Sequence, residues 1–136
     1  MAHEDAPPTT QLADLAAMAA NARYTAHVGA LWSLSAPDLN LNLVRFPAGD
    51  GVPAHVNNEV DVVVVVVSGE GVAEIDGREE QLRSGVLLFI PKGVTRAFHA
   101  TSGDLAYLTC HRRRARLMPQ RVQRESAALS TGESHS

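Results

Sequence analysis

Six consecutive valines at positions 62–67 are the feature that most constrains how this sequence can fold. β-Branched side chains lose rotamer freedom in a helix and pack well on a pleated surface, so the run predicts a β-strand. Because valine occupies both the odd and the even positions, both faces of that strand are apolar. Such a strand is expected in a sandwich or barrel that covers it on both sides.

Other segments with strand character lie on both sides of the valine run, at residues 27–34, 39–46, 71–82, 85–90, 94–100 and 105–111. Residues 39–46 alternate apolar and polar side chains, as a half-buried strand does. Asp76-Gly77 divides residues 71–82 into a hairpin, because this dipeptide supplies the positive backbone angles of a two-residue turn. Ser68-Gly69-Glu70-Gly71 is interpreted as a turn directly after the valines. Seven or eight short strands predict an all-β sandwich or small closed barrel.

The chain of 136 residues has the size of one domain. Residues 1–9 have turn and breaker character, and residues 118–136 belong to a polar, unpatterned tail, so both ends are expected to be disordered or mobile. The folded domain is therefore predicted over residues 10–117. It includes a short helix over about residues 10–23, with Thr10 as its cap. The apolar residues that recur there at helical spacing are Leu12, Leu15, Ala16 and Ala19.

Composition excludes several classes of protein. The net charge is -3, and although six of the twelve basic residues lie within 112–136, no aromatic side chains interleave with them to stack bases, so nucleic-acid binding is not expected. No apolar stretch approaches the roughly 20 residues of a membrane span. The N-terminus lacks a charged region followed by an apolar run, and we expect a cytoplasmic protein. The single cysteine, Cys110, excludes an internal disulfide.

Candidate functional residues gather directly before the valine run. His55, Asn57, Glu59 and Asp61 share one parity, so those that lie together on an extended segment would point the same way. Imidazole and carboxylate groups side by side are typical of acid–base catalysis or of ligand binding. The alternative interpretation is a set of solvated charges at the entrance of a strand.

The segment that follows the hairpin resembles the second signature of the cupin superfamily. It reads Gly85, five apolar or small residues, Pro91-Lys92-Gly93, and then Val-Thr-Arg96. His55 and the glycine-rich segment 68–71 resemble the first signature, and the resemblance covers roughly residues 40–112. It implies a jelly-roll barrel whose mouth holds a pocket, often with a divalent metal bound by two histidines and a glutamate from the first signature and one histidine from the second. It also implies a homodimer, which the apolar stripe of the predicted helix supports.

The metal ligands of the family do not transfer to this sequence. Only His55 matches; the second histidine position is Asn57, the glutamate position falls at Val62, or at Asp61 if a bulge is allowed, and the last histidine position is Arg96. A neutral amide is a poor metal ligand, and the fixed charge of arginine repels a dication. A metal-dependent form remains open if His27, His99 or His111 joins His55 and Asp61, and its metal would be Fe, Mn, Ni or Zn.

Arg96 indicates an anion instead. Its guanidinium fork suits a carboxylate or phosphate, which could belong to a ligand or to Asp61 or Glu59 in a buried ion pair. His99 has the opposite parity to Arg96 and is expected to face outwards. The sequence thus predicts a barrel that binds a small anionic or polar metabolite and, as an enzyme, performs isomerisation, elimination or hydrolysis.

The predicted roles divide the candidates into three groups. The catalytic residues are His55 and Asp61, the ligand-binding residues are Asn57, Glu59 and Arg96, and the metal ligands, if a metal is bound, are His55, Asp61 and His111. The rival hypothesis is a barrel without catalysis, which senses a ligand or serves in an assembly after losing the metal site.

Overall fold

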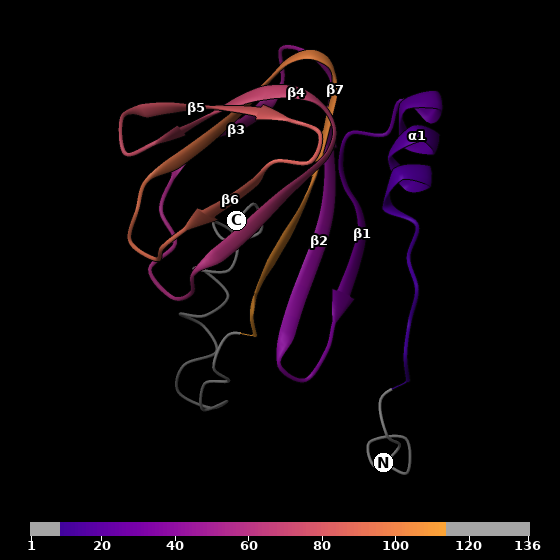
Figure 1. Ribbon diagram of the computed structural model, residues 1–136, viewed down its shortest axis with the longest axis horizontal. Helices are drawn as coiled ribbons and strands as arrows, with labels where there is room; N and C mark the ends of the chain where they lie inside the picture. Colours follow the sequence, from indigo (N-terminus) through magenta and orange to yellow (C-terminus); the bar gives the residue numbers. More distant parts are fainter. Residues whose placement is uncertain (1–8, 114–136) are drawn as a thin grey trace, which may run out of the picture.

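One helix and seven antiparallel strands make up residues 9–113, the part of the chain that the computed structural model describes (Figure 1). In chain order they are α1 (Leu15–Thr25), β1 (Gly29–Ser35), β2 (Leu39–Phe46), β3 (Gly51–His55), β4 (Val62–Ile75), β5 (Arg78–Arg83), β6 (Leu87–Ile90) and β7 (Arg96–Arg112). The all-β prediction is confirmed. The segments expected to be disordered lie, apart from Thr9, outside the described residues. Within 9–113, no helix is both long and apolar enough to cross a membrane.

Two long strands, β4 and β7, connect the two layers of the fold. They are antiparallel neighbours along most of their length, from the pair Val62 and His111 at one end to the pair Ile75 and Arg96 at the other. One half of each strand lies in the first layer and the other half lies in the second. One layer follows the order β1-β2-β7-β4, with β6 on the far side of β4. The other layer is formed by β3 beside the first part of β7 and by β5 beside the last part of β4. Residues 96–100 and 105–111, predicted as parts of two separate strands (94–100 and 105–111), therefore belong to the single strand β7, which begins at Arg96.

The predicted turn at 68–71 is wrong, because these residues lie inside β4 at the place where the strand bends between the layers. The register with β7 shifts there three times, between Val66 and Gly71. Gly69 has a φ of +80°, and a Cβ at this position would lie 1.8 Å from the main-chain oxygen of Asp104. The glycine is thus required by close strand crossing rather than by a chain reversal.

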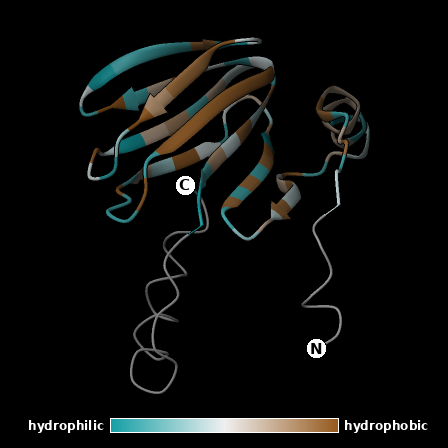
Figure 2. Ribbon diagram, turned by 60° about the horizontal axis from the view of Figure 1, so that its bottom comes forward, coloured by the Kyte–Doolittle hydropathy of each residue, from teal (hydrophilic) through white to brown (hydrophobic). Residues whose placement is uncertain are grey.

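Apolar side chains from both layers fill the space between them. Val62, Val64 and Val66 of β4 are buried there, and Phe98 stacks on Tyr107 with ring centroids 5.0 Å apart. Figure 2 shows hydrophobic residues along the strands and hydrophilic residues at several of the turns. Burial raises the pKa of Tyr107 above its ordinary value.

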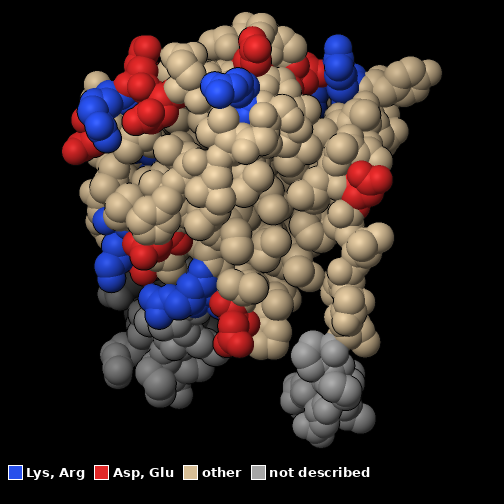
Figure 3. All heavy atoms as spheres, in the orientation of Figure 1, with Lys and Arg blue, Asp and Glu red and all other residues tan. Residues whose placement is uncertain are grey.

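The valine run is only half covered within the described residues. Val63, Val65 and Val67 are partly exposed, while the even-numbered valines of the run are buried. Figure 3 shows one face of the molecule, on which the charged side chains lie mostly around the edge and the middle is uncharged. The valine run was predicted to be covered on both sides. In the described residues it is covered on the side of the even-numbered valines and only partly covered on the other.

The helix begins later than the sequence suggested. Asp14 rather than Thr10 is its N-cap, and the Asp14 Oδ1 accepts a hydrogen bond from the main-chain nitrogen of Ala17 at 3.0 Å. Of the predicted apolar stripe, Ala19 is buried, whereas Leu12 lies before the helix and is 98% exposed. Ala22 is the other buried residue of α1.

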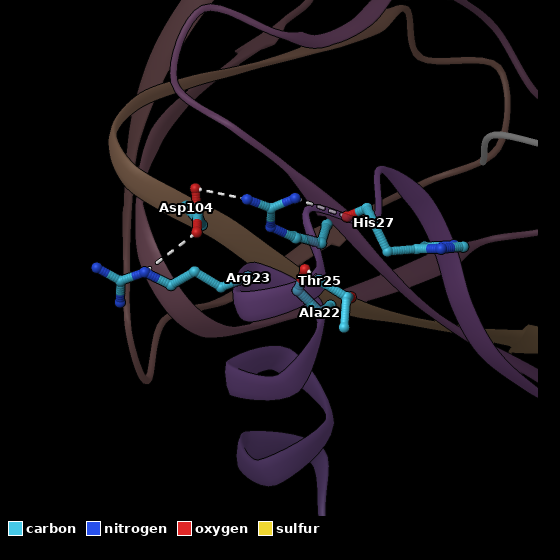
Figure 4. A network of polar contacts seen from close by, with 6 residues as sticks. Ala22, Arg23, Thr25, His27 and Asp104 are labelled. Atoms are coloured by element: carbon cyan, nitrogen blue, oxygen red, sulfur yellow. Dashed lines mark hydrogen bonds and ion pairs between the residues drawn. The ribbon is translucent and has the colours of Figure 1, made fainter.

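An ion cluster holds α1 against the sheet (Figure 4). Asp104 of β7 binds Arg23 of α1, with 3.3 Å from Oδ2 to Nε, and Arg45 of β2, with 2.9 Å from Oδ1 to Nη2. Arg45 Nη1 also donates a hydrogen bond to the main-chain oxygen of His27, at 2.6 Å. Because Arg45 is buried, Asp104 is its counter-charge and not merely a surface partner.

Asp104→Asn is expected to lower the free energy of unfolding by about 3 kcal/mol, since it leaves the buried Arg45 without a neutralising charge. Urea unfolding measures this loss, and hydrogen exchange should show α1 opening first. Arg23→Gln is the matched control, because it removes the exposed partner of the same carboxylate and should cost less than about 1 kcal/mol. Equal losses in the two variants would contradict the importance of the buried pair.

Candidate functional site

Arg96 is the first residue of β7, and its side chain is fully buried. Its neighbours across the sheet are His55 at the end of β3 and Ile75 at the end of β4. The guanidinium donates two hydrogen bonds to main-chain oxygens of the preceding loop, from Nε to Val94 at 3.0 Å and from Nη2 to Pro91 at 3.3 Å. The loop between β6 and β7 therefore fixes the direction of the side chain.

The remaining nitrogen of the guanidinium, Nη1, is buried and has no hydrogen-bond partner. Over residues 9–113, no carboxylate lies within ion-pair distance of Arg96. Burial lowers the pKa of Arg96 from its ordinary value, but an arginine side chain stays protonated in proteins. The site thus holds a positive charge and one guanidinium nitrogen whose hydrogens have no acceptor, a costly arrangement unless an acceptor binds there.

Asn57 supplies a second buried donor, in the loop that follows β3. Its Oδ1 accepts hydrogen bonds from the main-chain nitrogens of Glu59 at 2.8 Å and Val60 at 3.2 Å, and these bonds fix the orientation of the amide. Its own main-chain oxygen accepts one from Gly93, at 2.7 Å. The Nδ2 group is left buried without a partner. Asn57 therefore holds the loop after β3 against the loop before Arg96.

His55 is half-buried, and its orientation is set by a local contact. Its Nδ1 lies 3.0 Å from the main-chain oxygen of Pro53. A carbonyl can only accept, so this contact places the hydrogen on Nδ1 and, in the neutral ring, the lone pair on Nε2. His55 can therefore accept a proton or a hydrogen bond through Nε2.

A polar wall lies on the opposite layer, and apart from His111 the sequence analysis missed its residues. Val44 and Phe46 pack against the core, so Asn40 and Asn42, which share their parity on β2, face the same side. Beside them on β7 are Thr109, which is 3% exposed, and His111, which is 5% exposed. The alternation in β2 could have revealed the two asparagines, but it does not show which side of the strand is covered.

This wall and Arg96 lie toward the same end of the barrel. Val62 of β4 is paired with Ile90 of β6 on one side and with His111 of β7 on the other. Pro91 directly follows Ile90, and its main-chain oxygen accepts the hydrogen bond from the Arg96 guanidinium. His111 Nδ1 lies 2.9 Å from the main-chain oxygen of Arg112. We call this end, with Arg96, His55, Asn57 and His111, the polar end of the barrel.

Asp61 and Glu59 do not face the interior. The extended geometry that would align them with His55 and Asn57 is absent, because the turn made by Asn57 interrupts the segment between β3 and β4. Both carboxylates belong to exposed residues, and Asp61 Oδ1 accepts a hydrogen bond from the main-chain nitrogen of Lys92, at 2.9 Å. They line a groove of about 340 Å³ together with Lys92, His111 and Arg112. The alternative of a buried pair between Arg96 and Asp61 is therefore not what the structure shows.

The histidines considered as replacement ligands are spread over the molecule. His27 is exposed, and His99 faces outwards, as its parity predicted, 3.5 Å from Glu74. Throughout residues 9–113 no three His, Cys, Asp or Glu side chains are placed to hold a metal ion together, so His55, Asp61 and His111 do not form the expected set. The buried charge of Arg96 also opposes a dication, and these residues do not fit the metal that the resemblance implies.

Comparisons with known proteins agree with this architecture. A family model described as the cupin domain matches residues 42–111. Among solved structures, TT1209 from Thermus thermophilus is 21% identical, with a TM-score of 0.65, and the match covers 78% of this chain and 100% of that one. A cupin protein from Bacteroides fragilis is 20% identical, with a TM-score of 0.59 and coverages of 82% and 87%. KdgF from Halomonas is 22% identical, with a TM-score of 0.58 and coverages of 62% and 77%. No curated protein matches the sequence.

Proposed function

Because this chain belongs to the cupin family, we propose that it binds a small anionic metabolite at the polar end of its barrel. Arg96 holds the anion, and His55 lies beside it as the acid or base of an isomerisation, elimination or hydrolysis. The observation that supports this proposal above all is the buried Nη1 of Arg96, a charged donor without an acceptor. A carboxylate or phosphate oxygen at this point would satisfy the donor and offset the charge.

Asn57 supports the choice of an anion. Its unused Nδ2 is a second buried donor in the loop that follows His55, and two donors without acceptors suit an oxygen-rich group. The main-chain bond between Asn57 and Gly93 joins the two loops from which such an anion would be held. Movement of these loops would admit the ligand, since Nη1 is buried.

The catalytic part of the proposal concerns His55. A neutral histidine with its hydrogen on Nδ1 can take a proton through Nε2 from a substrate whose charge is neutralised by the neighbouring Arg96. General acid–base catalysis of this kind contributes roughly 10²- to 10⁴-fold and requires no metal. Asp61 and Glu59, predicted as a catalytic and a ligand-binding residue, are outside this arrangement.

A second candidate function is ligand binding without catalysis. It is favoured by Asp61, the expected carboxylate partner of His55, which is exposed and bonded to Lys92. The two functions share the anion site and differ in whether His55 reacts. Substitution of His55 by glutamine should lower the turnover of a substrate by roughly 10²- to 10⁴-fold in the first case and leave binding within about tenfold in both.

Anion binding is tested by NMR with the full chain, titrated with inorganic phosphate and with small mono- and dicarboxylates. We expect the resonances of the Arg96 Nε–H and of the His55 ring to shift together with one saturation curve. His27 is the internal control, because its ring is exposed and bonds to the main-chain oxygen of Ala30, at 2.8 Å. A shift of all histidines alike, or none at Arg96, would contradict the site.

A further inference from the structure

The outer side of the layer formed by β2, β7, β4 and β6 is covered at one end and open at the other. Near the Asp104 cluster, where α1 lies against the sheet, Leu43 and Ala106 are fully buried. Towards the end of β7 the same side is only partly buried, because Cys110 is partly exposed and Leu39 is 47% exposed. The covering that α1 provides therefore does not extend to this end of the layer.

The open part consists of Leu41, Val63, Leu87, Phe89 and Cys110, which we call the apolar outer face. Cys110 is paired with Leu41 on one side and with Val63 on the other, and Val63 is paired with Phe89. Paired residues share a side of the sheet and lie about 5 Å apart, so the row crosses four strands without a gap. Leu87 is 62% exposed and Phe89 is 53% exposed. Since the solvated side of an antiparallel sheet normally carries polar residues, this face has the composition of a covered surface.

The described part of the chain ends at the margin of this face. β7 ends at Arg112, and Arg113 is the last described residue. The main-chain nitrogen of Arg113 donates a hydrogen bond to the main-chain oxygen of Asp38 at 2.9 Å, and its Nη1 donates one to that of Ala36 at 3.0 Å. The groove of about 340 Å³ beside this point is lined by Arg112 and by Cys110 of the apolar outer face. The chain that follows Arg113 therefore starts next to this face.

The residues that follow also carry the side chains that such a surface requires. Residues 114–118 are Arg-Ala-Arg-Leu-Met, in which two large apolar side chains come directly after two cations. The opposite end of the chain is a poorer source, because residues 1–8 contain one large apolar side chain and precede α1, which lies at the covered end of the layer. The C-terminal segment is thus the part of this chain best suited to the face.

We propose that residues 114–118 turn back over the apolar outer face of their own chain, where Leu117 and Met118 cover Cys110, Val63 and Phe89. The distances permit this arrangement. Cys110 precedes the last described residue by three positions, about 10 Å along β7, and Phe89 lies two strands, again about 10 Å, to the side. Leu117 and Met118 follow that residue by four and five positions, which span up to about 13 to 18 Å.

Charges in the groove beside the face agree with the same arrangement. Its lining includes the carboxylates Glu59 and Asp61 as well as Lys92 and Arg112. Over residues 9–113, Asp61 has no Lys or Arg side chain within ion-pair distance. An arginine of the segment that crosses the groove would supply this cation. Because an exposed ion pair contributes little, the apolar contacts provide the affinity and the arginines set the direction of the segment.

The docked segment also accounts for the valine run. Val63 is partly exposed in the described residues, and it becomes buried once Leu117 and Met118 lie over it. This part of β4 is then covered on both sides within one chain, as its sequence predicts. A second copy of the chain is the rival occupant of the face, and the experiments below distinguish the two. The inference concerns a surface away from Arg96 and does not depend on the proposed anion site.

The first test is NMR of the full chain with labelled methionine methyl groups. The chain has three methionines, Met1, Met18 and Met118, so their signals are easily assigned by substitution. We expect nuclear Overhauser contacts between the Met118 methyl group and the ring of Phe89. Met18 of α1 is the internal control and should show none to this ring. A Met118 methyl group without contacts to the apolar outer face overturns the proposal.

Cys110 provides a second measurement, because it is the only cysteine and lies within the face. Leu117→Asp should speed its reaction with a small thiol reagent by at least about tenfold, since the substitution removes an apolar contact that keeps the segment docked. Leu129→Asp is the matched control and should leave the rate unchanged. Circular dichroism shows whether the barrel is intact in both variants.

Concentration separates the two possible occupants. In the unaltered chain the reaction rate of Cys110 should be the same at 1 and at 100 µM, because docking within one chain does not depend on concentration. Protection of Cys110 that increases with concentration, together with a doubled mass by sedimentation velocity, would mean that a second copy covers the face. That result overturns the proposal, and so does an unchanged rate in Leu117→Asp.

Discussion

Arg96→Met is expected to reduce the affinity for phosphate or a small carboxylate by at least about 100-fold and to leave the barrel folded. The loss follows from the removal of a buried charged donor, which typically contributes 2–5 kcal/mol to a complex when its partner is retained. Methionine has a similar length and no charge. Without ligand the variant should therefore be as stable as the unaltered protein, or more stable, because the desolvation cost of an uncompensated guanidinium disappears. Calorimetry of binding and thermal unfolding measure the two quantities.

Arg96→Lys is the control for charge. Lysine keeps the positive charge but lacks the planar fork that reaches Val94, Pro91 and the anion at the same time. Its affinity should lie between those of the unaltered protein and Arg96→Met. Two results together would contradict a role in anion binding. Arg96→Met would unfold the barrel while Arg96→Lys would not, and phosphate would stabilise neither the unaltered protein nor Arg96→Lys. The arginine would then serve only to hold the loop before β7.

Gly69→Ala is expected to cost more than about 4 kcal/mol, which is close to the whole stability of a small domain. The new Cβ would lie 1.8 Å from the main-chain oxygen of Asp104, and backbone on both sides of the crossing would have to move. Gly77→Ala is the matched control, because Gly77 has a similar φ of +86° and nothing within 4 Å of its Cβ position. Its cost should be about 1 kcal/mol, due to backbone strain alone.

Urea unfolding of both variants separates strain from collision. The difference between them isolates the close approach of β4 and β7, since the two glycines have similar positive φ values. Similar losses for Gly69→Ala and Gly77→Ala would mean that the strands can separate at the bend, and the account of Gly69 given above would then be wrong.

Local sequence signals predicted the regular parts of the fold. Residues 39–46 were expected as a strand and form β2 with the same bounds, because alternation is a property of neighbouring residues. Asp76 and Gly77, with φ values of 54° and 86°, make the expected turn between β4 and β5. The cupin resemblance then predicted how these strands are arranged, which no local signal could do.

The errors arose where distant residues decide the conformation. Gly69 reads as a turn in isolation, and only the passage of Asp104 behind it makes it part of a strand. Asp61 reads as a neighbour of His55 in an extended segment, but Asn57 bends that segment through its own side chain and through Gly93. The interior position of Arg96 followed from the signature, whereas its main-chain partners depend on the exact path of the loop after β6.

The sharing of β4 and β7 between both layers has a mechanical consequence. Neither layer can open or slide as a rigid body, because each is continuous with the other through two covalent strands. The backbone amides of both strands should therefore exchange with solvent at a single slow rate, in one global event. Under the proposed function, adaptation to a guest of a different size would be confined to the connections around Asn57 and Gly93, so selectivity would evolve in those short segments without disturbing the frame.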